Sequence, residues 1–154
     1  MAFDRTKERS AARLAAVQAL YQMDIAATDL ADVLAEFEAR FVREGAGEKF
    51  PHTEAPFFRD IVEGVLREQR ALDPKVDVIL NASWPLKRIE AILRAVLRAG
   101  AYELAHRGDV PARVVISEYV NVASSFLDRE ETGMVNAVLD QLARQARAAE
   151  FAAG

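Results

Sequence analysis

Apolar residues recur every three or four positions along most of the chain, and the alternating apolar and polar runs that are typical of strands are nearly absent. The pattern predicts an all-α fold. Each apolar stripe indicates one helix, and glycines, prolines and capping residues separate the stripes. We therefore expect about seven helices, whose stripes begin at Leu14, Leu30, Phe57, Val76, Ile89, Val114 and Met134.

Several boundaries between these helices can be predicted from local residues. Residues 45–52 form the clearest loop, and the glycine and proline within residues 108–111 oppose continuation of a helix. Asp73 is a good capping residue and Pro74 suits the first helical position, so this pair predicts the start of a short helix. Residues 148–154 are expected to fray.

The composition is that of one globular domain covering residues 1–154. About half of the residues, 51%, are hydrophobic, which is enough for one substantial core. The absence of cysteine excludes disulfides and thiolate metal sites and favours a reducing cytoplasm. No apolar run approaches the roughly 20 residues that cross a bilayer, and the polar N-terminus is unlike a signal peptide. We expect a soluble, cytoplasmic protein without a membrane partner.

Candidate catalytic residues are few. The two histidines, His52 and His106, lie far apart and are expected on the surface, and neither has metal-ligand spacing to a partner. A glycine-rich phosphate loop is missing. Residues 124–125 are serines on a predicted helix with no histidine at a useful spacing. The sequence therefore predicts no catalytic residue, no metal and no cofactor, and the protein is not expected to be an enzyme.

The carboxylates have structural explanations. Residues 128–131 place acids at the start of a helix, where they favour the macrodipole and cap the backbone. Glu118 lies near the start of another helix. Glu103 and Arg107 have the i, i+4 spacing of a helical ion pair. No pair of acids suggests general acid and base catalysis.

The formal net charge of -4 conceals a basic N-terminal arm. Residues 1–13 hold four cations and two acids, so the remaining residues carry a charge of -6. Arg5, Arg9 and Arg13 are four positions apart and would form one ridge on a helix, with Lys7 beside it. Arginine forks match phosphate and stack on bases. The arm is therefore either an RNA-binding element or a solvated helix start.

Seven segments together resemble the NusB family. They occur in the family's order with nearly ungapped spacing, and the resemblance covers essentially the whole chain. It implies two three-helix bundles packed roughly perpendicular, and a non-catalytic role in antitermination of ribosomal RNA transcription. The segments are residues 13–22, 58–65, 95–104, 110–111, 116–118, 125–126 and 134–140.

The resemblance also implies partners. Family members bind the single-stranded boxA element of nascent leader RNA together with NusE, a ribosomal protein, in the transcription elongation complex. One face of residues 78–101 is implied as the NusE surface. The alternatives are an accessory domain like that of ribosomal RNA cytosine methyltransferases, or a helical scaffold that binds only proteins. Both a monomer and a homodimer are compatible with the sequence.

For RNA, the resemblance implies contacts at two places. Arg9 and Arg13 match basic positions of the family's arginine-rich motif, and Arg5 and Lys7 precede them, whereas residues 10–11 lack the arginines that other members often have.

Further along the chain, Arg113 matches a basic family position, and Glu130 and Met134 align with a stretch that contacts RNA. Met134 lacks the aromatic ring found there in some relatives, and packing in the core is its alternative role.

Overall fold

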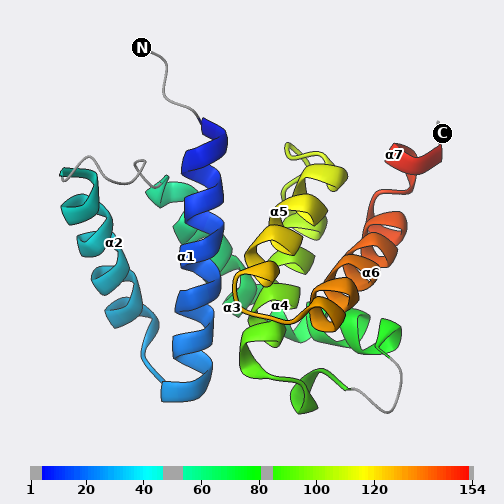
Figure 1. Ribbon diagram of the computed structural model, residues 1–154, viewed down its shortest axis with the longest axis horizontal. Helices are drawn as coiled ribbons and strands as arrows, with labels where there is room; N and C mark the ends of the chain where they lie inside the picture. Colours follow the sequence, from blue (N-terminus) through cyan, green and yellow to red (C-terminus); the bar gives the residue numbers. More distant parts are fainter. Residues whose placement is uncertain (1–4, 47–53, 81–84, 153–154) are drawn as a thin grey trace.

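The computed structural model describes residues 5–46, 54–80 and 85–152, and these ranges contain helices and no strand (Figure 1). The all-α prediction is therefore confirmed. The elements are α1 (Arg5–Ala26), α2 (Leu30–Ala46), α3 (Ala55–Ile79), the 3-10 helix η1 (Leu86–Arg88), α4 (Ala91–His106), α5 (Ala112–Ser124), α6 (Arg129–Ala146) and α7 (Ala148–Ala152). Within the same ranges, no helix is long and apolar enough to cross a membrane.

The long helices form two groups of three. Helices α1, α2 and α3 pack against one another, as do α4, α5 and α6. Helix α4 joins the groups because it contacts α1 and α3 on one side and α5 and α6 on the other. Almost all of its residues from Leu93 to Leu104 are buried, so the centre of the core runs along α4. In Figure 1, α1 lies between α2 and α5, which places its first turns beside the second group.

Pro74 does not begin a new helix, and this prediction is wrong. Helix α3 continues through Pro74 to Ile79. A proline inside a helix removes one hydrogen bond and crowds the preceding turn. Here Leu72 and Val76, on either side of it, are both buried, and their packing keeps the helix in line. Asp73 is not a cap either, because its carboxylate accepts from Arg98 Nε at 3.0 Å and Nη2 at 2.8 Å.

The C-terminal residues 148–152 are helical where fraying was expected. They form α7, in which Phe151 packs against the core and Glu150 Oε2 accepts from the backbone N–H of Ala112 at 2.9 Å. The described part of the chain thus has the expected number of α-helices, seven, but divided differently, since two predicted helices are one and α7 is additional. The predicted loop at 45–52 lies mostly outside the described residues.

The start of α6 confirms the predicted cap. Asp128 accepts from the backbone N–H of Glu131 at 2.8 Å, and the Glu131 side chain reaches back to the N–H of Asp128 at 3.5 Å. This capping box satisfies two of the N–H groups that a helix start leaves without a partner.

Candidate nucleic-acid interface

Arg13 is buried, with 2% of its surface exposed, although it lies among the expected RNA-binding cations. Its Nε and Nη2 atoms donate to the two oxygens of Glu103 at 2.7 and 3.0 Å, and Nη1 donates to Glu118 Oε1 at 2.8 Å. Every nitrogen of the guanidinium therefore faces a carboxylate of α4 or α5. The expected ridge of exposed arginines is interrupted here, because Arg13 presents no donor to a phosphate.

Two hydroxyl groups complete this arrangement. Tyr119 Oη donates to Glu103 Oε2 at 2.5 Å, and Ser10 Oγ donates to Glu118 Oε1 at 2.5 Å. Burial and the charge of Glu103 raise the pKa of Tyr119 well above its ordinary value. Burial alone would lower the pKa of Arg13, but the hydrogen bond to Glu103 and its charge raise it. We call these five residues the buried network, and it holds the first turns of α1 against α4 and α5.

Arg9 lies one turn earlier and is partly exposed. Its Nε donates to Glu54 Oε2 at 3.1 Å, and its guanidinium lies over the buried ring of Phe57, 4.5 Å from the centroid. Arg13 and Arg107 lie over the same ring at 4.9 and 4.8 Å. Cations are attracted to the face of an aromatic ring, so Phe57 positions all three arginines.

Arg107 has partners other than Glu103, the partner that its helical spacing predicted. It does not pair with Glu103, because that carboxylate is taken by Arg13 and Tyr119. Instead, Arg107 Nη1 donates to Asp60 Oδ2 at 3.0 Å, and Nε and Nη2 donate to the two oxygens of Asp109 at 3.0 and 2.9 Å. The tertiary fold therefore brings Arg107 beside Arg9, and no local pattern indicated this.

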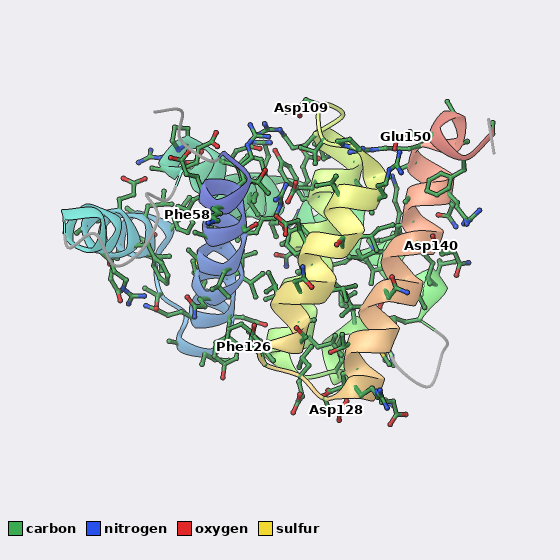
Figure 2. The ribbon with its side chains drawn as sticks, turned by 45° about the horizontal axis from the view of Figure 1, so that its top comes forward. Phe58, Asp109, Phe126, Asp128, Asp140 and Glu150 are labelled. Carbon is green, nitrogen blue, oxygen red and sulfur yellow. The ribbon has the colours of Figure 1, made fainter. Side chains whose placement is uncertain are left out.

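The remaining candidate residues lie at two ends of the α5–α6 pair. Lys7 and Arg113 are exposed at the end that carries Arg9, and the side chain of Arg5 lies outside the described residues. Glu130 is exposed in the first turn of α6 at the opposite end, and Met134 packs partly buried against the core. Figure 2 shows the separation, with Asp109 at one end and Asp128 at the other. Packing in the core, the alternative role of Met134, agrees with this partial burial.

A groove of about 150 Å³ between α1 and α5 lies between these two ends. Its lining includes polar groups of Ser10 and Asn121 and the apolar side chains of Leu14 and Val122. In the turn after α5, Phe126 exposes 43% of its surface beyond the groove (Figure 2). Its position after the last turn of α5 turns the ring outward, and an exposed ring can stack on a base.

His106 is exposed, as expected, and stacks on Tyr102 with ring centroids 5.1 Å apart. Its Nε2 is 3.8 Å from Glu68 Oε2. Among residues 5–46, 54–80 and 85–152, no three His, Asp or Glu side chains gather in a way that could hold a metal ion. His52 lies outside these ranges. His106 is not part of the lining of the groove.

Residues 10–144 match the family model described as the NusB family. The chain belongs to the NusB family. It is similar to the transcription antitermination protein NusB of Bradyrhizobium diazoefficiens, with 64% identity over 97% of this chain and 92% of the relative. It is also similar to the protein of that name from Nitrobacter hamburgensis, with 62% identity over 96% of this chain and 93% of the relative.

Solved structures agree with the fold. T. maritima NusB superposes with a TM-score of 0.77 at 26% identity, covering 93% of this chain and 96% of that chain. A chain from a crystal structure of the antitermination factors NusB and NusE with double-stranded RNA gives 0.72 at 22% identity, covering 93% of this chain and 99% of that chain. The second likeness shows the fold alone. The two groups of three helices are thus the arrangement of this family.

Proposed function

We propose that this chain is a non-catalytic RNA-binding transcription antitermination factor. It binds the boxA-type single-stranded leader RNA of ribosomal RNA operons, together with NusE, within the transcription elongation complex. It therefore works in the cytoplasm. The observation that carries the proposal is the groove between α1 and α5, which has exposed cations at one end and an exposed aromatic ring at the other.

The two ends of the groove offer different contacts to RNA. At the first end, Lys7, Arg9 and Arg113 offer donors to phosphates, which position a strand without reading its sequence. At the second end, Phe126 offers a face on which an unstacked base can lie. Helix α5 has 13 residues and is therefore roughly 20 Å long. A short single-stranded segment of RNA can span the length of α5. Glu130 and Met134 lie on α6, beyond Phe126, and would contact the strand where it leaves the groove.

NusE is the proposed protein partner because the relatives carry the NusB name and NusE accompanies NusB in the compared complex with RNA. The proposed face runs over residues 78–101. Within it, Val78 is exposed and Leu93 is buried. Arg94 donates to Asp24 Oδ2 at 2.7 Å and has a structural role. Exposed side chains such as Val78 and Lys87 are therefore the better candidates for direct contact.

Fluorescence anisotropy with a boxA leader RNA, with and without NusE, tests the proposal. We expect NusE to tighten RNA binding, and RNA to tighten NusE binding by the same factor. Replacing both Lys7→Gln and Arg9→Gln should weaken RNA binding roughly tenfold and reduce the slope of log affinity against log salt by about 1.4. The matched control is Arg70→Gln with Arg144→Gln, which removes two exposed cations that do not line the groove.

A second variant tests the aromatic end. Phe126→Leu should weaken binding by about fivefold or more while leaving the salt slope unchanged, because stacking does not release counterions. Equal affinity for boxA and scrambled RNA, with no effect of NusE, would contradict the proposal. A preference for folded ribosomal RNA would instead favour the accessory-domain alternative.

A further inference from the structure

Arg9 and Arg107 converge on one carboxylate oxygen. Asp109 Oδ2 lies 2.9 Å from Arg107 Nη2 and 3.8 Å from Arg9 Nη1, and Asp109 Oδ1 accepts from Arg107 Nε at 3.0 Å. The carboxylate is therefore held by two guanidinium groups that come from the start of α1 and the end of α4. Figure 2 shows Asp109 in the turn that links α4 to α5.

The two guanidinium groups are held in place without Asp109. Both lie over the ring of Phe57. Each also has a second carboxylate partner: Glu54 accepts from Arg9 Nε at 3.1 Å and Asp60 accepts from Arg107 Nη1 at 3.0 Å. Because the two guanidinium groups are already held in place, a ligand that binds them costs little side-chain entropy. The planar guanidinium group of arginine donates to the oxygens of phosphate as well as to those of a carboxylate.

The backbone of the turn that carries Asp109 is also held by hydrogen bonds. Arg147, on the segment between α6 and α7, donates to the backbone carbonyl of Arg107 at 2.7 Å and to that of Val110. The backbone on both sides of Asp109 is thus anchored, and only the Asp109 side chain needs to move for the two arginines to face solvent.

Asp109 is the most exposed member of this group. Its side chain is 54% exposed, whereas those of Arg9 and Arg107 are 23% and 22% exposed. Ion pairs with an exposed partner contribute little free energy because water competes for both charges. The hydrogen bond from Arg107 lowers the pKa of Asp109 to about 2, so the carboxylate is ionised at neutral pH.

We propose that Arg9 and Arg107 form a phosphate subsite, that Asp109 occupies it as an internal competitor, and that a backbone phosphate of bound RNA displaces the Asp109 side chain. This inference rests on the function proposed above and adds Arg107 and Asp109 to it. A phosphodiester and a carboxylate each carry one negative charge, so the exchange leaves the charge facing the two arginines unchanged. An internal competitor of this kind lowers affinity for every RNA strand that uses the subsite, because phosphate contacts do not depend on base sequence.

The decisive variant is Asp109→Asn, which keeps an oxygen that accepts from Arg107 but removes the charge. We expect its affinity for the boxA leader RNA, measured by fluorescence anisotropy on the full chain at low salt, to rise about fivefold. Affinity for a scrambled strand should rise by at least the same factor. Asp109→Ser, which also shortens the side chain, should give a similar gain, and thermal melting shows whether each variant is folded.

The chain contains a matched control. Asp140 on α6 accepts from Arg144 Nε at 3.0 Å, and its side chain is 43% exposed, so it is another surface aspartate paired with an arginine (Figure 2). Asp140→Asn changes the net charge by the same amount, and it should alter RNA affinity by less than about 1.5-fold because it lies away from the groove.

The requirement for Arg107 separates a subsite from general charge effects. Arg107→Gln should weaken RNA binding about fivefold. In the double variant with Asp109→Asn, the gain in RNA affinity that Asp109→Asn gives alone should be lost, because the subsite then lacks one of its two guanidinium groups. If Asp109→Asn binds RNA no more tightly than Asp140→Asn while the unchanged protein binds normally, the internal competitor is ruled out and the proposed function stands. If none of these proteins binds RNA, the proposed function fails and the subsite fails with it.

Discussion

Arg13 and Glu103 form a two-pronged ion pair inside the protein although they are 90 residues apart in the sequence. The exposed fractions of their side chains are 2% and 0%. Glu118 accepts a third hydrogen bond from Arg13, so one side chain of α1 links α4 and α5. The cation that sequence spacing grouped with the RNA-binding arm is therefore what fixes that arm to the body of the protein.

Removing this cation should destabilise the fold strongly. Arg13→Met leaves the Glu103 carboxylate buried without its partner, so we expect a loss of about 3–5 kcal/mol in the free energy of unfolding. Urea unfolding followed by circular dichroism measures it. Arg59→Met, at an exposed ion pair with Glu38, is the control and should leave the free energy of unfolding nearly unchanged because water screens the pair. Replacing Glu103→Leu as well as Arg13→Met should recover much of the loss, and a small effect of Arg13→Met alone would contradict this assignment.

The buried phenol of Tyr119 should make the protein less stable at alkaline pH. Its pKa in the folded protein is raised well above its ordinary value, whereas in the unfolded chain it titrates near 10. The unfolded state therefore loses the proton first, so the contribution of Tyr119 is constant below about pH 10 and falls as pH rises further. Urea unfolding between pH 8 and 11 should show a shallower alkaline decline for Tyr119→Phe than for the unchanged protein. Identical slopes would show that this phenol is not the group responsible.

Replacing two helical glycines by alanine should change the stability of the protein in opposite directions. A Cβ at Gly64 would lie 2.1 Å from Cζ of the Tyr102 ring, whereas a Cβ at Gly133 would meet nothing within 4 Å. Alanine favours a helix over glycine by about 1 kcal/mol at either position. We expect Gly133→Ala to raise the melting temperature and Gly64→Ala to lower stability by roughly 1–3 kcal/mol, because the ring must shift. Differential scanning calorimetry on both variants tests the pair, and equal shifts would contradict the close contact.

Arg147 should be needed to close the end of α4. It donates to the carbonyls of Glu103, Leu104 and Arg107 at 2.9, 3.0 and 2.7 Å. The carbonyls of Glu103 and Arg107 also accept from the backbone N–H groups of Arg107 and Val110, so the Leu104 carbonyl depends most on Arg147. A carbonyl buried unsatisfied at a helix end is costly. Arg147→Met should therefore lower the free energy of unfolding by about 2–3 kcal/mol. Arg144→Met, three residues earlier and exposed, is the matched control and should change it by less than about 1 kcal/mol.

The helical periodicity of the sequence was sufficient for the fold class and for most helix positions, but not for Pro74. Local rules give a proline after an aspartate the character of a helix start. In the folded chain, the burial of Leu72 and Val76 outweighs that preference. Local residues could not reveal this, because the surfaces that cover these two side chains come from other helices.

The candidate site was only partly predictable for a related reason. The spacing of Arg9 and Arg13 placed them correctly on one helix, but their partners are 45 to 105 residues away. One signal did point to burial of Arg13, since it precedes the buried Val17 by four residues and Leu20 by seven and so shares their stripe. Arg107 and Phe126 had no such signal, because their positions depend on how α4 and α5 meet α1.

The buried network also has a consequence for the order in which the molecule can be assembled. A ribosome adds roughly 5–20 residues per second, so about 5–20 s separate the synthesis of Arg13 from that of Glu118, which lies 105 positions later. Glu103 is made 15 residues before Glu118, so two of the three hydrogen bonds of the guanidinium can form before α5 supplies the third. The first turns of α1 are thus held by all their partners only when α5 is present, and a nascent chain that stops before α5 lacks the carboxylate that accepts from Ser10 and Arg13.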